Sequence, residues 1–298
     1  MSELPLDQVR TLLAAVDEGT FDAAARLLHV TPSAVSQRIK ALEHRIGRVL
    51  LLRTRPIQLT ESGEVVVRFA RQLAQLEQDA GVELGLPETG QPARLPIAVS
   101  ADATDVWLMP AMANAVRRTP MNLELIREDE GHTLELLHQG VVMAAVSSDA
   151  RPVQGCLVRN LGRMRYFAMA SPEFHQRWFA GRPLAQVLPE APVIEFDRKD
   201  VVQDNFARAI GALRSPATVR HYVPSTEAFR QAVINGLGWG TIPEQQAESE
   251  RATGALVDLA VNTPFDVPLY WHQWKLDSPA LAVLAESIAA EAAAALYQ

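Results

Sequence analysis

The sequence predicts an α/β protein in two parts, a small helical module at the N-terminus and a larger two-lobed region after it. Three observations predict this. Apolar residues recur at three- and four-residue steps through the first 46 residues, which indicates helices. The charge then changes sign, because residues 26–55 carry seven bases and one acid, whereas residues 61–298 carry 20 bases and 29 acids. From Leu95 onward, short β-rich runs alternate with helical stretches.

Composition bounds the class of protein. The chain has 298 residues, of which 48% are hydrophobic and 21% charged, so it can bury a sizeable core and is not disordered as a whole. No apolar run approaches the roughly 20 residues that cross a bilayer, and the first residues lack the pattern of a signal peptide, so we expect a cytoplasmic chain with no membrane partner. The single cysteine, Cys156, excludes an intrachain disulfide and a thiolate-rich metal site, and we expect it to be a buried bystander.

Three helices are expected in the basic module. The first has an apolar face from Leu6 to Val16, and the second begins at Phe21 with small alanines on its apolar face. The third begins at Thr31-Pro32, because a hydroxyl N-cap followed by proline is a strong helix start, and it runs to about Ile46.

The third helix has two distinct faces. Its apolar face consists of Val35, Ile39, Leu42 and Ile46. Its polar face consists of Ser33, Ser36, Gln37 and Lys40. Short hydroxyls, an amide and a lysine near a helix N-terminus suit the major groove of DNA, where glutamine can pair with adenine. The alternative from periodicity alone is the solvated face of an ordinary three-helix bundle.

A β-hairpin is expected next. Two short apolar runs, Val49–Leu52 and Ile57–Leu59, flank a basic tip that contains Pro56. We expect Arg53 and Arg55 at this tip to lie along the phosphate backbone, which adds affinity without sequence information.

These residues carry a family resemblance. The stretch 24–43, followed by Gly47, Leu50, Arg53, Thr60 and Gly63, resembles the winged helix-turn-helix signature of LysR-type transcriptional regulators. The resemblance implies a homodimer or homotetramer that reads a dyad-symmetric promoter site in double-stranded DNA, responds to a small effector and contacts RNA polymerase, typically as an activator. The residues expected to contact DNA are Thr31, Pro32, Ser33, Ser36, Gln37, Arg38, Lys40, Arg53 and Arg55.

A long helix is expected to link this domain, residues 1–60, to the rest. Thr60 can cap it, and the helix extends over residues 61–86. Its apolar positions follow a heptad spacing and are expected to form a dimerisation seam: Val66, Phe69, Leu73, Leu76 and Ala80. A stripe that packs within one chain is the alternative. Glycine and proline residues then predict a hinge over residues 87–93.

The remaining residues, 94–298, are expected to form a two-lobed domain. A second α/β unit begins after Tyr166, and Leu269–His272 is expected to be a strand that returns to the first sheet. Lobe 1 then spans about 94–167 and 265–298, and lobe 2 about 168–264. A cleft between such lobes holds small ligands. The LysR family fold, similar to type 2 periplasmic binding proteins, implies the same arrangement.

Catalytic motifs are missing from the sequence. The seven histidines include no His-Glu-x-x-His pair, and neither a Gly-x-Ser-x-Gly elbow nor a phosphate-binding Gly-x-x-x-x-Gly-Lys occurs. The glycines at 236, 238 and 240 follow an expected helix, so Asn235-Gly236 is better explained as a helix C-cap before a strand. We therefore expect no enzyme active site, no cofactor and no metal.

Segments of the C-terminal region resemble the ArgP/LysG branch of the LysR family, whose members were also described as chromosome replication initiation inhibitors. These segments are 99–110, 144–148, 195–197, 225–229 and 269–272. The resemblance implies lysine or arginine as effector and a basic amino acid exporter gene as target.

A basic amino acid needs hydroxyls or N–H groups for its carboxylate and acids for its cationic ends. The expected effector-binding residues are Ser100, Asp102, Thr104, Glu128, Ser147, Asp197, Ser225 and Thr226. Asp102 and Asp197 are the first candidates for the cations and Glu128 is the reserve. Helix capping or a surface position is the alternative for each acid. Trp107 and Trp271 either wall the cleft or belong to the core.

Two other functions remain open from the sequence. One is an effector-independent architectural DNA-binding protein that inhibits replication initiation. The other is a cytosolic amino-acid-binding protein or enzyme with a vestigial helix-turn-helix. Footprinting distinguishes them, because the first gives broad A·T-rich protection and the second gives none.

Overall fold

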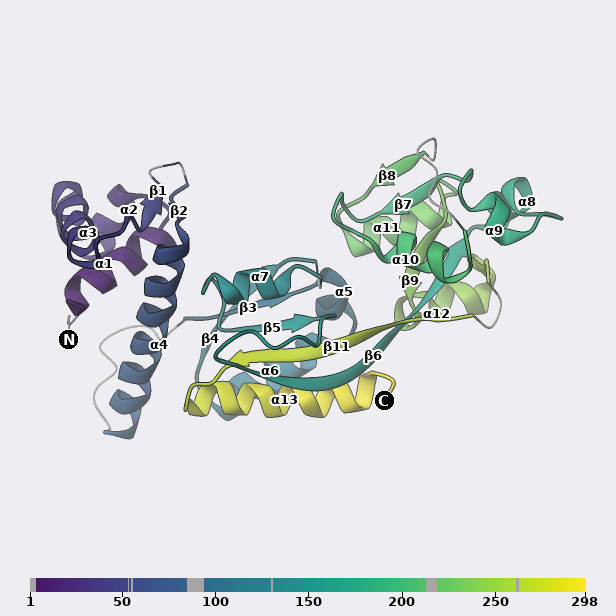
Figure 1. Cartoon of the computed structure of the whole chain (residues 1–298). Helices are drawn as coiled ribbons and strands as arrows, with labels where there is room; N and C mark the ends of the chain where they lie inside the picture. Colours follow the sequence, from purple (N-terminus) through teal and green to yellow (C-terminus); the bar gives the residue numbers. More distant parts are fainter. Residues whose placement is uncertain are drawn as a thin grey trace.

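A computed structural model describes residues 4–52, 54, 56–84, 94–129, 131–212, 219–260 and 263–298. Figure 1 shows a small helical domain at one end, a long helix beside it, and two α/β lobes beyond. None of the described helices combines the length and the apolar character needed to span a membrane.

The N-terminal domain consists of three helices and a short hairpin, as predicted. Its elements are α1 (Leu6–Asp17), α2 (Phe21–Leu27), α3 (Pro32–Ile46), β1 (Leu51–Leu52) and β2 (Gln58–Leu59). Thr31 Oγ1 caps α3 by accepting a hydrogen bond from the Ala34 N–H at 3.2 Å. Gly47 ends the helix with a φ of +75°, a left-handed conformation that favours glycine. The expected phosphate contacts Arg53 and Arg55 lie outside the described residues.

The linker helix α4 (Glu61–Glu83) begins as expected, because Thr60 Oγ1 accepts a hydrogen bond from the Gly63 N–H at 3.1 Å. Val66 is only 6% exposed and packs in the core of the N-terminal domain, so it is not available to a second chain. Phe69 and Leu76 are 39% and 44% exposed, and Leu73 is half-buried. Of the predicted seam, the part beyond Val66 therefore remains open to a partner.

Lobe 1, as we use the term for the structure, is built on five neighbouring strands of a curled sheet in the order β4-β3-β5-β11-β6. Their bounds are β3 (Arg94–Val99), β4 (Asn122–Arg127), β5 (Ala144–Ser147), β6 (Cys156–Ala170) and β11 (Phe265–Trp274). β3 pairs in parallel with β4 and β5, while β11 pairs antiparallel with β5 and β6. The expected return of the chain to the first sheet at Leu269–His272 is confirmed.

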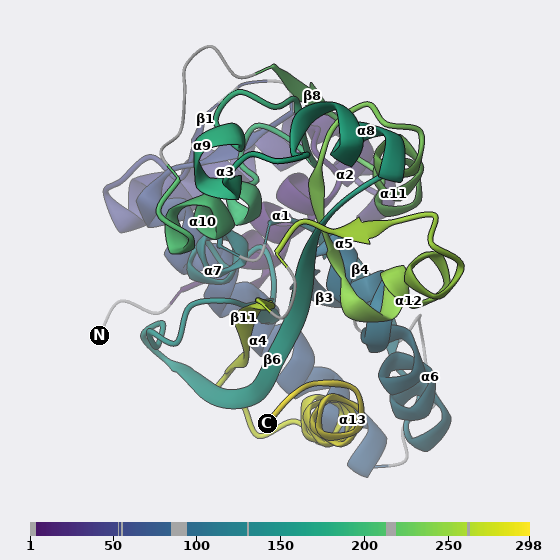
Figure 2. The ribbon, with the colours of Figure 1, turned by 90° about the vertical axis from the view of Figure 1, so that its right-hand side faces the viewer.

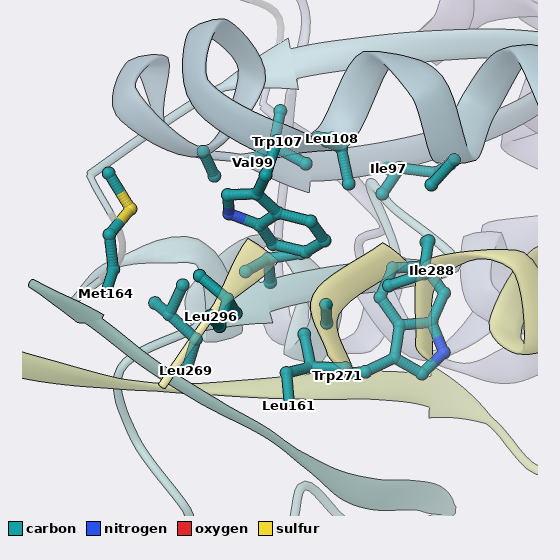
Figure 3. Close-up of a cluster of buried hydrophobic side chains, with 14 of the residues drawn as sticks. Ile97, Val99, Trp107, Leu108, Leu161, Met164, Leu269, Trp271, Ile288 and Leu296 are labelled. Carbon is teal, nitrogen blue, oxygen red and sulfur yellow. The ribbon is translucent and has the colours of Figure 1, made fainter. Parts of the chain in front are cut away.

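The helices of lobe 1 cover both faces of this sheet. They are α5 (Ala101–Ala103), η1 (Thr104–Leu108), α6 (Met109–Arg118), α7 (Thr133–His138) and α13 (Pro279–Ala295). Figure 3 shows Trp107 and Trp271 inside the cluster between η1, α13 and the sheet, and both are almost fully buried. They belong to the core rather than to the wall of a cleft.

The helix expected over Val106–Val116 begins earlier than predicted and opens with the π-helical turn η1. Pro110 has no backbone N–H, so it cannot donate to the Val106 carbonyl as a regular α-helix requires. This places a wider turn beside Asp105, where the chain enters the space between the lobes. Such π turns interrupt helices chiefly at functional sites.

Lobe 2 is built around the far half of β6, which pairs with β9 (Gly240–Pro243) and β10 (Val257–Asp258). The other strands, β7 (Val193–Glu195) and β8 (Arg220–Tyr222), pair in parallel. The helices are α8 (Pro172–Trp178), α9 (Leu184–Val187), α10 (Val202–Ala209), α11 (Thr226–Ile234) and α12 (Glu244–Thr253). α11 ends as predicted, with Asn235 at its C-cap and Gly236 at a φ of +74°.

The two lobes share β6 and β11, which run from one to the other (Figures 1 and 2). The sequence did not indicate that β6 is one strand of 15 residues. A bulge between Leu269 and Tyr270 interrupts the pairing of these strands opposite Gly162. Gly162 has a φ of +119°, and a Cβ there would lie 2.6 Å from the Tyr297 carbonyl oxygen, so only glycine fits.

Candidate DNA-binding surface and ligand cavity

The polar face of α3 is accessible as predicted. Thr31, Pro32, Ser33, Gln37 and Lys40 are exposed, whereas the apolar residues on the other side of the helix pack in the domain core. Packing of that apolar face against α1 and α2 fixes which face the helix presents to solvent.

Not every predicted DNA contact is equally exposed. Ser36 and Arg38 are half-buried. The Arg38 guanidinium donates a hydrogen bond to Thr11 Oγ1 at 3.4 Å, which holds its stem against α1. At the start of the helix, the hydroxyls of Thr31 and Ser33 lie 2.9 Å apart. The N-terminal turn of α3 therefore carries two hydroxyls at the positive end of the helix dipole, where a phosphate binds favourably.

A cavity of about 110 Å³ lies between the lobes. Segments far apart in the sequence line it: α5, the end of β4, Tyr166 of β6, the loop after β7, β9, and the first turns of α10, α11 and α12. Its charged lining residues are Asp102, Arg127, Glu128, Asp129, Asp197, Asp200 and Arg230. Five acids against two arginines make this a site for a ligand that carries positive charge.

Asp102 is the most deeply placed of the predicted acids. The Tyr166 hydroxyl donates to its Oδ2 at 3.0 Å, and Ser100 Oγ holds the local turn by accepting from the Ala103 N–H at 3.2 Å. Burial raises the pKa of Asp102 to about 6, the Tyr166 hydrogen bond lowers it, and the nearby carboxylate of Asp200 raises it further. A bound cation would compensate this buried negative charge.

Asp197 lines the cavity, but its carboxylate organises its own loop. Its Oδ1 accepts hydrogen bonds from the N–H groups of Lys199 at 2.7 Å and Asp200 at 3.2 Å. The Asp200 carboxylate in turn accepts from the N–H groups of Phe196 at 2.8 Å and Val202 at 2.9 Å. Burial raises the pKa of Asp200, against these hydrogen bonds. The Asp197 Oδ1 therefore closes a turn of the loop after β7 and caps no helix, because α10 begins only at Val202 with Val201 as its N-cap.

Glu128 is engaged by a lysine of the opposite lobe. The Lys199 Nζ donates to both carboxylate oxygens of Glu128 at 2.9 Å. Burial opposes ionisation of Glu128, but the hydrogen bonds from Lys199 and from the Asp129 N–H outweigh it and hold its pKa below the usual range. Glu128, the reserve candidate for binding a cationic group, is therefore already paired with Lys199.

Further contacts join the lobes at the edge of the cavity. The Arg127 guanidinium donates to the Pro224 carbonyl oxygen at 3.2 Å and lies 5.1 Å from the centre of the Phe196 ring. The Thr226 hydroxyl donates to the Asp105 carboxylate. These contacts bring lobe 1 and lobe 2 together over the ligand space and partly enclose it.

The predicted hydroxyl residues are divided between two hollows. Thr226 lines the cavity, while Thr104 and Ser225 line an adjoining hollow that shares Thr226 and Arg127 with it. Ser225 Oγ caps α11 by accepting from the Ala228 N–H at 3.4 Å, and Thr104 Oγ1 donates to the Ser100 carbonyl oxygen at 2.9 Å.

The structure does not bring Ser147 to the cavity. It is fully buried at the end of β5, where its Oγ accepts a hydrogen bond from the Asp149 N–H at 3.1 Å. Cys156 is buried as expected, and burial raises the pKa of its thiol to about 11. Among the described residues, no group of three histidines, cysteines or acids is placed to hold a metal ion.

Several lining residues were not found from the sequence. They include Tyr166 on β6, Gln203 on α10 and Thr241 on β9, all three of them almost fully buried. A polar residue at a buried position was the available signal, but such residues occur throughout cores, so the signal alone has little specificity.

Both parts of the chain match known protein families. Residues 6–64 match the model of the bacterial regulatory helix-turn-helix protein, lysR family, and residues 88–293 match the LysR substrate binding domain. The lysine export transcriptional regulatory protein LysG of Corynebacterium glutamicum is 40% identical over 285 residues, which are 94% of this chain and 95% of that protein.

Two solved structures are similar over nearly the whole chain. The crystal structure of ArgP from Mycobacterium tuberculosis has a TM-score of 0.84 and 41% identity, and 98% of each chain is covered. Full-length LysG from Corynebacterium glutamicum with bound effector Arg has a TM-score of 0.76 and 38% identity, and the alignment covers 99% of this chain and all of that one.

Proposed function

The chain belongs to the LysR family of DNA-binding transcriptional regulators, and we propose that its effector is a basic amino acid, lysine or arginine, bound in the cavity between the lobes. The proposal rests on one observation, the environment of the Asp102 carboxylate. This half-buried carboxyl lines the partly enclosed cavity, and its hydrogen-bond donor among the described residues is the neutral Tyr166 hydroxyl. A buried carboxylate without a cationic partner is costly, and an ammonium or guanidinium group removes that cost.

The other end of the effector is an α-carboxylate. The start of α11 at Thr226, together with Arg127 on the cavity wall, offers donors for it, whereas the Arg230 guanidinium is already held by Glu227 and Glu250. A ligand with two cationic groups and one anionic group matches a lining of this charge pattern. The LysG structure with bound effector Arg, which is 38% identical, supports the same choice.

On the DNA side, we propose that α3 enters the major groove. Gln37 lies at the middle of its exposed face and can read a base, while Lys40 and the hydroxyls at the N-terminal turn approach phosphates. Arg53 and Arg55 remain proposed backbone contacts of the hairpin tip. The division into residues 1–60, 61–86, 87–93 and 94–298 is likewise our proposal. The predicted hinge 87–93 lies outside the described residues, and the family matches over 6–64 and 88–293 support a boundary between the two main parts.

We propose that α4 joins two chains into a dimer, with a tetramer as the larger assembly. Phe69, Leu73 and Leu76 support this, because they leave apolar surface on one stripe of a 23-residue helix. Two copies related by a twofold axis present two recognition helices, which fits a dyad-symmetric promoter site.

The target we propose is the gene of a basic amino acid exporter, activated through RNA polymerase when the effector accumulates. The relative named for lysine export supports this choice. Because its partner is the bacterial chromosome, the protein would act in the cytoplasm.

The test combines binding and footprinting. Calorimetry of the full chain with L-arginine and L-lysine should give saturable binding of both, and L-glutamate serves as the charge-reversed control. Footprinting upstream of an adjacent, divergently transcribed gene should show one discrete dyad site whose protection changes with the bound amino acid. Protection that neither amino acid alters, or binding of L-glutamate in preference, would refute the proposed effector.

A further inference from the structure

Gln203 lies on the cavity wall with an acceptor that no described residue satisfies. The side chain is on the first turn of α10 and is 3% exposed. It hydrogen-bonds to the Asp200 carboxylate, which also accepts from two backbone N–H groups. Since a carboxylate of this kind only accepts, the Gln203 amide nitrogen must face Asp200 and the Oε1 must face away from it. That Oε1 has no hydrogen-bond partner among the described residues.

Thr241 presents a second such atom on the same side of lobe 2. It is 5% exposed on β9, lines the same cavity, and its Oγ1 also lacks a partner among the described residues. Trp239 lies two residues before Thr241, directly ahead of β9, and on extended backbone two such side chains point to the same side. Trp239 packs against Phe206 of α10, with ring centres 6.0 Å apart, and Phe206 is one helical turn after Gln203. The two unsatisfied oxygens therefore belong to one region, where α10 covers β9.

Unsatisfied buried oxygens at a cavity wall indicate a ligand that hydrogen-bonds to them: the Gln203 Oε1 can only accept, so its partner must donate, and the Thr241 hydroxyl can accept or donate. Leaving a buried acceptor unpaired costs about 1 to 3 kcal/mol, so such atoms in native proteins usually have a partner that supplies the hydrogen. Both groups are neutral. They can add hydrogen bonds to a ligand without adding charge, which Asp102 already provides.

The two basic amino acids differ in how many donors they bring. A guanidinium has five N–H donors in a fixed plane, and a single carboxylate accepts two of them side by side. The remaining N–H groups need other acceptors inside an enclosed site. The lysine ammonium has three donors on one nitrogen, and one carboxylate together with one further acceptor nearly satisfies it.

We infer that Gln203 and Thr241 are the specificity-determining residues of this cavity, and that they favour a guanidinium over an ammonium at the tip of the effector's side chain. This inference rests on the proposed function, since it requires that a basic amino acid occupies the cavity. Discrimination between arginine and lysine is thereby assigned to lobe 2, and the countercharge for the ligand's cationic group to Asp102 of lobe 1.

The experiment compares variants in the full chain by calorimetry with L-arginine and L-lysine. Gln203→Met removes the acceptor and keeps the length of the side chain, and Thr241→Val removes the hydroxyl and keeps its shape. Gln231→Met is the matched control, because Gln231 is exposed on α11 and bonds to Glu227 outside the cavity. Thermal unfolding of each variant identifies any that is misfolded.

We expect Gln203→Met to weaken L-arginine binding about tenfold or more and L-lysine binding by less than about threefold, so that the ratio of the two affinities falls. Thr241→Val should change the ratio in the same direction, and Gln231→Met should leave it unchanged. An equal loss for both ligands would overturn the inference, because it would place the two residues against the shared α-amino acid part. Unchanged affinities would also overturn it. If wild type binds neither amino acid, the proposed function itself fails, and this outcome is distinct from any effect of the variants.

Discussion

The polar face of α3 and the polar wall of the cavity both present side chains to a binding partner, but the chain builds them differently. The residues of the α3 face lie within ten consecutive positions, and most are exposed. The cavity takes its residues from both lobes, between Ser100 and Gln246, and several are almost fully buried. A long charged polymer is read by an exposed surface that one helix can supply. A small molecule has to be enclosed, and enclosure needs several segments.

The two regions also differ in how far their polar groups are already paired. In the cavity, Asp197 and Asp200 accept hydrogen bonds from the backbone of their own loop, and Glu128 is paired with Lys199 of the opposite lobe. Asp102, Gln203 and Thr241 are the lining residues on which we base ligand recognition. The difference teaches that charge alone does not identify a ligand-binding acid, because most acids of this cavity hold the site together.

The regions are connected through the linker helix. The Arg68 guanidinium of α4 donates to the His138 carbonyl oxygen at the end of α7 at 3.3 Å. At Gly140 a Cβ would lie 2.8 Å from the Arg68 Cβ, so the helix and lobe 1 are in close contact. A change in lobe 1 can therefore reach the helix that positions α3.

The largest expected effect abolishes DNA binding and leaves effector binding intact. Leu76→Asp places a charge on the exposed apolar stripe of α4, so the dimer should dissociate and operator binding should be lost, since one half-site offers too few contacts. Effector binding, which uses one chain, should persist in calorimetry. Sedimentation should show monomers, whereas Leu237→Asp, with similar exposure in lobe 2, should remain dimeric. A dimeric Leu76→Asp protein with full operator affinity would contradict the seam.

The next effect tests which acid binds the ligand. Asp102→Asn keeps the size of the side chain and removes its charge, and it should cost about 2 to 5 kcal/mol of affinity for L-arginine and L-lysine, the range for truncating one partner of a buried charge pair. Asp197→Asn is the matched comparison and should cost less, because the Asp197 Oδ1 is used by its own loop. Calorimetry measures both. A larger loss in Asp197→Asn would reverse the assignment.

Changes on the α3 face should alter sequence reading without altering ligand affinity. Gln37→Ala should lose about 1 to 3 kcal/mol of discrimination at one base pair, measured with single-position operator variants. Lys40→Ala should instead weaken binding to all DNA sequences alike. If Lys40 contacts a phosphate, the variant should also reduce the slope of log affinity against log salt concentration by about 0.9. Equal behaviour of the two variants would contradict the division between base reading and phosphate contact.

The smallest effect is a pH dependence confined to the cavity. Burial raises the pKa of Asp102 to about 6, so the carboxyl is ionised above this pH and protonated below it. A cationic effector needs the ionised form, and its affinity should therefore fall about tenfold from pH 7.5 to pH 5. Titration of the Asp102→Asn variant over the same range should show a flatter profile. A wild-type affinity that does not change with pH would exclude Asp102 as the countercharge.

From neighbouring residues alone, α3 could be predicted almost to the residue. Thr31-Pro32 and Gly47 bound α3, and the apolar period of 35, 39 and 42 fixes its buried face. These are local interactions within one helix and its caps, so neighbouring residues suffice to predict them. The α/β class of the larger part and the return of β11 to the first sheet also followed from local runs and their order.

Which residues line the cavity together could not be predicted from local sequence, because it depends on how distant segments pack. Ser147 and Thr226 are both polar residues near the end of one element and the start of the next, yet Ser147 is buried beneath a turn and Thr226 lines the cavity. Tyr166 reaches Asp102 because β6 runs unbroken through both lobes, and Gln203 and Thr241 line the same cavity because α10 packs on the segment that leads into β9. Such contacts depend on strand length, register and packing between distant segments, and none of these is encoded within a short stretch of sequence.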